Sequence, residues 1–233
     1  MRILITGANG QLGRALQAAL SDHHVIPVAH DTLDVGADYS VDAIVALFPE
    51  LVIHAAAMTN VDACERNPDE AYRVNALGAK HIAQACAELN APLVYVGTDY
   101  IFDGLKGEPY LETDAANPIS VYGRTKLEGE NFARALVPKH YIVRTSWVYA
   151  RGRNNFVTKI LALAAERPRL NVVNTEFSSP TYAPDLAQAI VALVSHPQYG
   201  TYHLSNEGVT SRFDYARAIL DEAGQANYPL DHP

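Results

Sequence analysis

The chain begins with Arg2-Ile-Leu-Ile-Thr6, followed by Gly7-Ala-Asn-Gly-Gln-Leu-Gly13 and then by Arg14-Ala-Leu-Gln-Ala-Ala-Leu20. The first segment is apolar and predicts a buried strand, and the third has the apolar spacing of a helix. Glycines between them let the backbone turn tightly and approach a pyrophosphate, while the helix N-terminus supplies free N–H groups and partial positive charge. This opening therefore predicts a dinucleotide-phosphate loop.

Strands and helices continue to alternate over the first 150 residues. Further strands are predicted at residues 25–29, 51–57, 93–96 and 141–144, with helices at 41–48, 67–89 and 122–136. Such alternation implies a parallel sheet with helices on both faces. We expect an α/β protein with a Rossmann-like doubly wound parallel sheet at residues 1–150. The nucleotide site should lie at the carboxyl ends of its strands.

The pattern changes after Tyr149. Helices are expected at residues 156–166, 185–195 and 212–224, and strands at 170–173 and 201–204. Because these elements interrupt the simple alternation, residues 151–233 are predicted to form mostly a smaller mixed α/β lobe that binds substrate over the strand ends.

The stretch from Leu93 to Lys126 has the residues for proton chemistry. An apolar strand ends at Thr98, and Tyr122 and Lys126 follow at i, i+4, which places them on one face of a helix. An ammonium beside a phenol favours the ionised form, so we expect Lys126 to lower the pKa of Tyr122 toward the range useful for acid–base catalysis. A Tyr–Lys pair at this spacing also occurs by chance. Its interpretation as a catalytic pair depends on the hydroxyl of Thr98 at the end of the preceding strand.

Two acidic residues, Asp31 and Asp34, follow the second predicted strand and are candidates to bind the adenosine ribose. The alternative is a helix cap or a solvated loop. No Lys or Arg occurs between Arg14 and Arg66, so no guanidinium is evident for a 2′-phosphate. We therefore expect NADH to be used at least as well as NADPH.

The bulk composition disfavours several classes of protein. A net charge of −8 does not predict the basic face of a nucleic-acid binder. Cys64 and Cys86 are too few for a disulfide framework, and no Cys/His/carboxylate cluster has metal-site spacing. No apolar run reaches membrane-spanning length, and no signal peptide is evident. We expect a cytoplasmic protein without a metal, nucleic acid or membrane partner.

The motifs together resemble the extended short-chain dehydrogenase/reductases, and among them the dTDP-4-dehydrorhamnose reductase family. The matching segments span nearly the whole chain: Gly7–Gly13, His54–Ala57, Thr59, Val61-Asp62, Val74–Ala76, Thr98–Gly104, Tyr122–Glu130, Arg144–Tyr149 and Ser179–Ala183.

This resemblance implies NADH- or NADPH-dependent reduction of the C4 ketone of a nucleotide-activated deoxysugar, with dTDP-4-dehydro-L-rhamnose converted to dTDP-L-rhamnose. Thr98, Tyr122 and Lys126 would be the catalytic residues. The cofactor would contact Gly7, Asn9, Gly10, Gln11, Leu12, Gly13, Asp34, Val35, Ala55, Ala56, Ala57, Thr59, Tyr122 and Lys126. The nucleotide sugar would contact Thr98, Asp99, Trp147 and Asn155. For Trp147, simple core packing is the alternative.

Three departures from the family pattern affect these expectations. Thr175-Glu176 precedes Phe177 where members commonly carry Asp-Gln, which leaves the sugar open. Ala15 stands where some members carry a Glu that binds a divalent ion at a dimer contact, so a homodimer is expected without such an ion. The chain stops at Pro233, before the family's Arg-Pro segment, which suggests a partial chain.

Two other functions remain open. A non-catalytic relative, the regulatory subunit of methionine adenosyltransferase, resembles this family and binds a partner. The complete set of Thr98, Tyr122 and Lys126 favours an enzyme, because a pure binding protein does not require it. Nucleotide-sugar epimerases and dehydratases share the fold. A dehydratase needs an added acid/base pair, of which Asp99 could be one half, but no Glu stands directly beside it.

Overall fold

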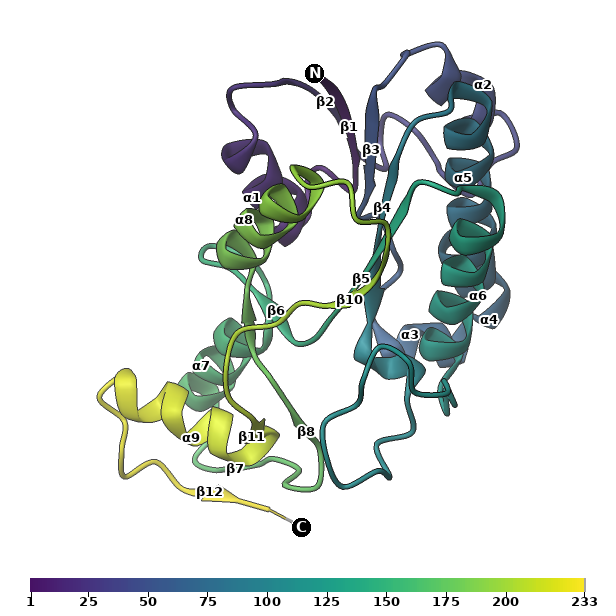
Figure 1. Ribbon diagram of the computed structural model, residues 1–233. Helices are drawn as coiled ribbons and strands as arrows, with labels where there is room; N and C mark the ends of the chain where they lie inside the picture. Colours follow the sequence, from purple (N-terminus) through teal and green to yellow (C-terminus); the bar gives the residue numbers. More distant parts are fainter. Residues whose placement is uncertain (233) are drawn as a thin grey trace.

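The computed structural model describes residues 1–232 and contains a central sheet of six parallel strands (Figure 1). The order is β10-β5-β4-β3-β1-β2. The strands are β1 (Arg2–Thr6), β2 (His24–Val28), β3 (Leu51–His54), β4 (Leu93–Thr98), β5 (His140–Thr145) and β10 (Gly200–His203). The order reverses at β1, which pairs with β2 on one side and β3 on the other. The predicted Rossmann-like sheet is confirmed.

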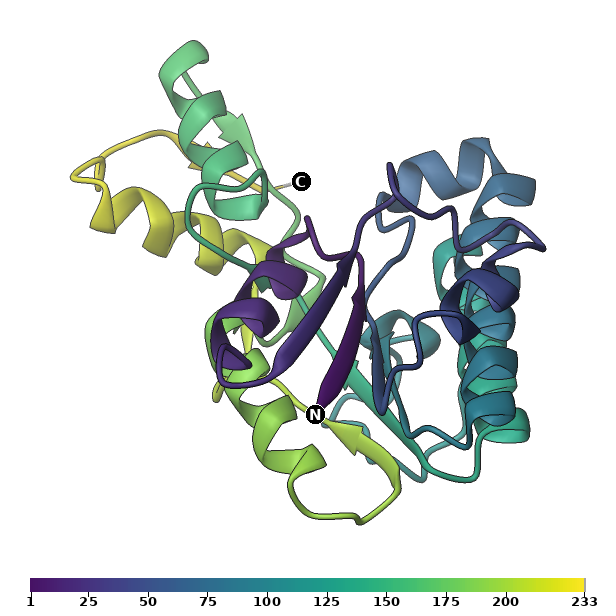
Figure 2. The same cartoon turned by 90° about the horizontal axis from the view of Figure 1, so that it is seen from above.

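Helices cover both faces of this sheet (Figure 2). One face carries α1 (Gln11–Ala19) and α8 (Ala183–Val194), and the other carries α2 (Ser40–Val45), α5 (Gly78–Leu89) and α6 (Val121–Leu136). Side chains alternate along each strand, so Ile3 and Ile5 pack toward α1 and α8 while Leu4 packs toward α2 and α5. All three are fully buried, as expected of a parallel sheet covered on both faces.

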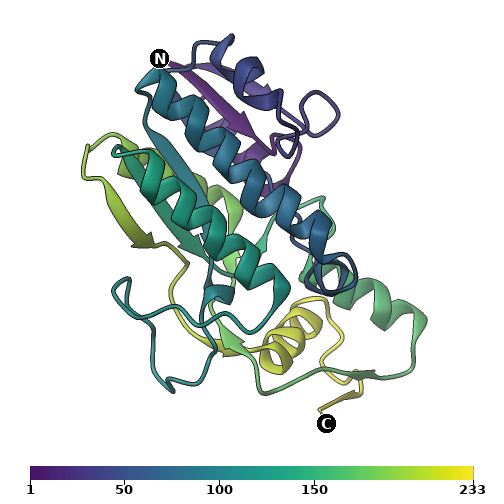
Figure 3. The same ribbon diagram turned by 90° about the vertical axis from the view of Figure 1, so that its right-hand side faces the viewer.

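The helix expected from Asn67 to Leu89 has three parts. It starts as α4 (Pro68–Tyr72), passes through a π-helical turn, η1 (Arg73–Leu77), and continues as α5, which runs alongside α6 (Figure 3). Pro68 lies in its first turn. The Asn67 side chain does not cap this helix, because its amide donates to the Ala63 carbonyl in a preceding short helix, α3 (Val61–Arg66).

A smaller lobe lies beyond the carboxyl ends of the strands (Figure 1). It contains α7 (Phe156–Glu166), α9 (Arg212–Glu222) and the strand pairs β7 (Leu170–Asn171) with β12 (Leu230–Asp231) and β8 (Phe177–Ser178) with β11 (Thr210–Ser211). Ile160 and Leu220 belong to its own apolar core. A further pair, β6 (Val148–Tyr149) with β9 (Thr181–Tyr182), lies where the chain passes between the sheet and this lobe.

The expected boundary at residue 150 does not match the strand order. Helix α8 and strand β10 come from the later part of the chain, yet both belong to the sheet region. Leu186 and Ile190 of α8 cover the apolar side of α1, and β10 extends the sheet beyond β5. The lobe therefore consists of two stretches of chain, one before α8 and one after β10. That it binds the substrate stays a prediction. No helix within residues 1–232 has the length and apolar character to cross a bilayer.

Candidate functional site

The glycine loop after β1 packs directly against the chain that leaves β3. Gly7 has a φ of +67°, and a β-carbon there would lie 2.8 Å from backbone atoms of Ala55 and Ala56. The Gly10 N–H donates to the Gly7 carbonyl at 2.8 Å. Gly13 lies inside α1, where a β-carbon would overlap the Gly7 carbonyl. The tight turn is confirmed, and α1 begins at Gln11, earlier than the expected Arg14.

The other predicted cofactor contacts lie around this loop. Strand β3 ends at His54, so Ala55–Ala57 form a partly exposed segment beyond it rather than the end of a strand, followed by exposed Thr59. Asn9 is exposed, whereas the side chains of Leu12 and Val35 are buried in opposite cores. Only the backbone of the last two is left to face a dinucleotide.

A buried hydrogen-bond chain supports the segment after β3. His54 Nδ1 lies 2.7 Å from Thr6 Oγ1, which accepts the Ala56 N–H at 3.3 Å. Burial, with the charge of Lys126, lowers the pKa of His54 to about 3, so its imidazole is neutral at pH 7. His54 Nε2 is buried without a partner in the described part of the chain.

A guanidinium does reach the region beyond β2. Arg73 Nη1 lies 2.7 Å from Asp34 Oδ2, and its Nε and Nη2 donate to Glu70 at 2.7 and 2.8 Å. Burial acts to raise the pKa of Asp34, but its bonds to Arg73 and to the Gly36 N–H leave that pKa lowered. The expectation that no guanidinium stands here is wrong, because Arg73 comes from η1, far along the chain. Asp31 is exposed.

Tyr122 and Thr98 meet at the carboxyl end of β4. Ser120 caps α6 by accepting the Gly123 N–H at 3.0 Å, which places Tyr122 in the first turn. Tyr122 and Thr98 are 9% and 5% exposed. Burial raises the pKa of Tyr122, and its hydrogen bond with Thr98 acts in the opposite direction. The phenol is therefore held in its protonated form.

Lys126 does not act on Tyr122 as the spacing suggested. Its Nζ donates to the Val96 carbonyl at 2.8 Å and lies 4.3 Å from the centre of the Tyr95 ring. Burial lowers the pKa of Lys126 to about 7, although the charge of Glu130 opposes this shift. The expected lowering of the Tyr122 pKa is therefore wrong, because burial dominates at both groups.

Two polar networks hold α6 in place. Glu130 is fully buried and accepts two bonds from Arg144, at 2.6 and 3.0 Å, and one from Arg134 at 2.7 Å. Asn75, in η1, accepts the Met58 N–H at 2.8 Å and donates to the Met58 carbonyl at 3.1 Å. Its amide nitrogen also donates to the Thr125 hydroxyl at 3.1 Å. Asn75 is thus internal, and it ties the segment after β3 to the helix of Tyr122.

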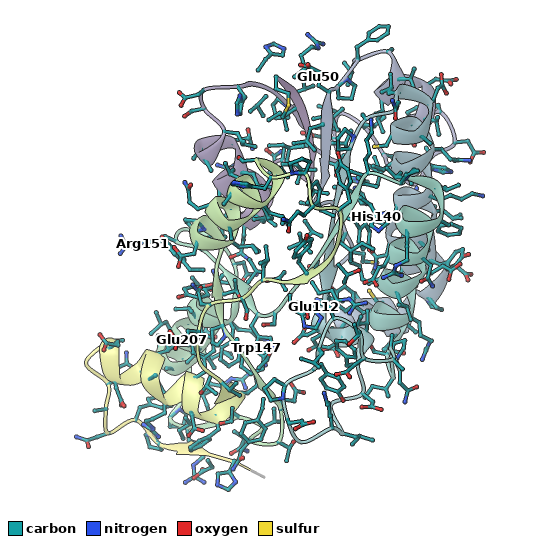
Figure 4. The ribbon with its side chains drawn as sticks, viewed as in Figure 1. Glu50, Glu112, His140, Trp147, Arg151 and Glu207 are labelled. Carbon is teal, nitrogen blue, oxygen red and sulfur yellow. The ribbon has the colours of Figure 1, made fainter. Side chains whose placement is uncertain are left out.

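A cavity of about 790 Å³ lies between the ends of β4 and β5, the loop at residues 102–120 and the smaller lobe. Its lining includes Asp99, Tyr100, Arg144, Trp147, Glu176 and Ser178. Figure 4 shows Trp147 and Glu112 toward the lobe and Glu50 at the opposite end of the sheet. Burial raises the pKa of Asp99, while hydrogen bonds from Ser178, at 2.8 Å, and Thr98 act against this shift. The cavity therefore begins beside the Thr98–Tyr122 pair.

Trp147 lies in the cavity wall and also packs against neighbouring side chains. It lines the cavity, but the Arg212 guanidinium lies 3.6 Å from its ring centre and the Tyr215 ring stacks near it at 6.2 Å. Its φ of +41° is unusual for a large residue. Packing against Arg212 leaves less of the indole for a sugar than expected.

Asn155 does not line the cavity. It caps α7, where its Oδ1 accepts the Thr158 N–H at 3.2 Å. Its amide nitrogen donates to Gln11 Oε1 at 3.0 Å and to the Ala150 carbonyl at 2.7 Å. Gln11 in turn donates to the Val148 carbonyl at 3.2 Å. These bonds join α1 to α7, so both amides serve structure here, and the predicted substrate contact of Asn155 is not supported by its position.

Sequence reasoning missed three charged residues of this region: Arg73, Glu130 and Arg212. None stands in a recognisable local motif. The one available signal was that Glu130 follows Lys126 at i+4, which places the two opposite charges on one face of a helix. Within residues 1–232, no group of three or more His, Cys, Asp or Glu residues is arranged to hold a metal ion.

The chain matches the family model described as the RmlD substrate binding domain over residues 1–232. It is 39% identical over 226 residues to the spore coat polysaccharide biosynthesis protein SpsK of Bacillus subtilis, covering 96% of this chain and 80% of the relative. It is 40% identical over 241 residues to the dTDP-4-dehydrorhamnose reductase of Escherichia coli, covering 99% and 81%.

Solved structures agree with these relatives. A dTDP-4-dehydrorhamnose reductase from Clostridium acetobutylicum superposes with a TM-score of 0.95 at 42% identity, covering 100% of this chain and 84% of the other. The dTDP-4-dehydrorhamnose reductase from Bacillus anthracis, solved in complex with NADP, superposes with a TM-score of 0.94 at 40% identity, covering 100% of this chain and 84% of the other. A dTDP-glucose 4,6-dehydratase from Streptomyces venezuelae superposes with a TM-score of 0.87, covering 100% of this chain and 84% of the other. Its sequence identity is only 15%, so this likeness shows a shared fold alone.

Proposed function

The chain belongs to the RmlD substrate binding domain family, and from this premise we propose that it is a dTDP-4-dehydrorhamnose reductase. It uses NADH or NADPH to reduce the C4 ketone of dTDP-4-dehydro-L-rhamnose to dTDP-L-rhamnose. The observation that carries the proposal is the buried Thr98–Tyr122 pair, which directly adjoins Asp99 and Tyr100 in the wall of a cavity large enough for a nucleotide sugar.

The residues around the glycine loop fit a dinucleotide. Gly7 and Gly13 have no room for side chains, so the backbone of the loop packs tightly against the chain after β3 and against itself. A tight turn of this kind is what a pyrophosphate loop requires. The N-terminus of α1 adds N–H groups suited to a pyrophosphate. When bound, the cofactor supplies the hydride. Lys126, one helical turn after Tyr122, would exchange its bond to the Val96 carbonyl for the nicotinamide ribose.

The protein's own groups supply the proton. Thr98 donates a hydrogen bond to the ketone oxygen, and Tyr122 gives its phenolic proton to that oxygen as negative charge develops there. Burial keeps Tyr122 protonated at neutral pH, so the proton is present, but it also makes the phenol a weaker acid, and the Thr98 hydroxyl acts against that rise in pKa. Asp99 and Trp147 line the cavity and contact the sugar.

The structure gives a reason for expecting NADH to be used at least as well as NADPH. Arg73 is the guanidinium near the end of β2, but its charge is already balanced by Asp34 and Glu70. A 2′-phosphate would have to compete with both carboxylates. Steady-state kcat/KM for the two cofactors tests this, and a strong preference for NADPH would show that Arg73 is free to bind the phosphate.

The activity is tested with purified protein and a panel of nucleotide 4-keto-sugars, by following oxidation of the reduced nicotinamide cofactor. We expect turnover with dTDP-4-dehydro-L-rhamnose and its loss in Thr98→Val, which keeps the shape of the side chain but removes the hydroxyl. A protein that binds the nucleotide sugar but never oxidises cofactor would instead support the non-catalytic alternative. Elimination of water from a dTDP-hexose would support a dehydratase.

Two expectations from the sequence stay predictions. A homodimer is proposed for the protein in solution, and light scattering on an eluting sample would measure its mass. A cytoplasmic location is also proposed, and fractionation of the producing cell would test it.

A further inference from the structure

We propose that Arg212 binds the diphosphate of the nucleotide sugar and that Glu176 holds its guanidinium in place until the diphosphate arrives. This inference rests on the proposed function. It adds a binding residue from the smaller lobe to a site otherwise described from the sheet.

The Arg212 guanidinium is fixed by aromatic rings. Its carbon lies 3.6 Å from the centre of the Trp147 ring and 5.0 Å from that of Phe156. A guanidinium stacked on aromatic faces keeps its N–H donors in the plane, where they are free to meet a planar or tetrahedral anion. Arg212 is the first residue of α9, next to the β8–β11 pair, so the backbone also fixes its position.

The charge of Arg212 reaches the cavity. Burial raises the pKa of Asp99 and of Tyr100, and the positive charge of Arg212 opposes the shift at both. Asp99 and Tyr100 line the cavity, as do Trp147 and Glu176, which Arg212 contacts directly. Arg212 thus stands immediately behind the cavity wall, and its side chain remains 17% exposed.

A diphosphate needs such a cation, because the cavity is acidic. Its lining carries the carboxylates of Asp99, Asp103, Glu108 and Glu176. The lining cation Arg144 is already committed to Glu130 through two hydrogen bonds. A substrate with two anionic phosphates would meet net repulsion unless another cation faced it, and Arg212, which contacts Trp147 and Glu176 of the cavity wall, is such a cation.

The ion-pair partner of Arg212 is Glu176. Its carboxylate lies 3.4 Å from Arg212 Nε and is 55% exposed. Exposed ion pairs of this kind contribute little to stability, so exchange of Glu176 for a phosphate is easy.

The test compares a ligand that carries the diphosphate with one that lacks it. Calorimetry would give Kd for dTDP and for thymidine with the wild type, Arg212→Met and Glu176→Gln. Methionine keeps an unbranched stem against Trp147 and removes only the cation. The matched control is Arg217→Met on the same helix, because Arg217 donates to the Ala226 and Tyr228 carbonyls.

We expect Arg212→Met to weaken dTDP about 10- to 100-fold, the effect of losing a charge-assisted hydrogen bond, and to leave thymidine unchanged. Glu176→Gln should bind dTDP more tightly, and Arg217→Met should match the wild type. Equal dTDP affinity in Arg212→Met and the wild type would overturn the inference, and so would equal losses for both ligands. If the wild type itself binds no dTDP, both the proposed function and this inference about Arg212 are wrong.

Discussion

Tyr122 keeps its phenolic proton because burial raises its pKa, and Lys126 loses affinity for its proton for the same reason. Both groups lie within one turn of α6, but each responds more to removal from water than to the other. The Thr98 hydroxyl acts against the rise in the Tyr122 pKa. In the proposed reaction, Tyr122 therefore releases its proton only to the negative charge that develops on the ketone oxygen.

Tyr122→Phe should lower kcat about 10²- to 10⁴-fold, the usual contribution of a general acid, because the ring remains and only the proton donor is lost. Cofactor affinity should change little, since the glycine loop and Lys126 are intact. Turnover and cofactor Kd measure the two effects. Tyr39→Phe, at a side chain 60% exposed, is the control. Retention of most of the turnover would exclude Tyr122 as the acid.

His54 should make the protein less stable in mild acid. Its pKa is lowered by burial from 6.5 to about 3, so between these values the unfolded chain binds more protons than the folded one. The free energy of unfolding should therefore fall as the pH drops from 6.5 toward 3, by up to about 1.4 kcal/mol per pH unit from this group.

His54→Asn replaces the imidazole by an amide that does not titrate, so its stability should depend less on pH over that range. Urea unfolding of both proteins at several pH values measures the difference. Parallel pH profiles for the two proteins would show that His54 already takes up a proton in the folded state.

The two long helices beside the sheet approach each other so closely that one position requires glycine. A β-carbon at Gly129 of α6 would lie 2.5 Å from the Asn75 carbonyl, 2.6 Å from the Tyr95 hydroxyl and 2.9 Å from the Ala79 β-carbon. The Asn75 carbonyl belongs to the π-helical turn, and such turns are frequent at functional sites. This close packing sets the distance between the Tyr122 helix and the chain after β3.

Gly129→Ala should destabilise the protein, although alanine favours a helix over glycine by about 1 kcal/mol. The atoms that the new β-carbon meets are mostly backbone or buried, so the helices must separate, and overpacking of this kind typically costs about 1–3 kcal/mol. Thermal or urea unfolding measures the change.

Ala135→Gly, at an exposed position of the same helix, is the matched control. It should lose only about 1 kcal/mol of helix propensity. A Gly129→Ala protein as stable as the wild type would mean that α5 and α6 can move apart freely.

Across the whole molecule, the cavity lies where the sheet region and the smaller lobe meet. The sheet side of its lining includes Asp99 and Arg144, and the lobe side includes Glu176 and Ser178. Helix α8 and strand β10 return the chain to the sheet between the two halves of the lobe. The lobe is thus attached to the sheet by several chain crossings, which favours a fixed cavity.

EDTA should leave turnover and molecular mass unchanged. Alanine at position 15 offers no oxygen ligand where some family members carry a Glu, and Ca²⁺ and Mg²⁺ require oxygen ligands. Activity and light scattering before and after chelation measure both properties. A loss that added Mg²⁺ reverses would reveal a metal site built from other residues.

The sequence alone determined the parts of this protein that depend on neighbours in the chain. Alternation of apolar strands with helices predicted the parallel sheet, and the spacing of Gly7 to Gly13 predicted the tight turn. The helix expected at residues 212–224 is present as α9, whose first turn is capped by Ser211 three residues from the N–H it accepts. These features follow from backbone geometry and covalent spacing.

Only the tertiary structure decided which distant groups meet and how much water they lose. It brought Arg73 to Asp34, added β10 beside β5, and placed Arg212 on Trp147. It also changed the predicted chemistry of Lys126, whose pKa depends on burial rather than on spacing. Such contacts arise from packing of whole helices and strands, and no local pattern contains them, because the free energy of a buried charge is set by everything that surrounds it.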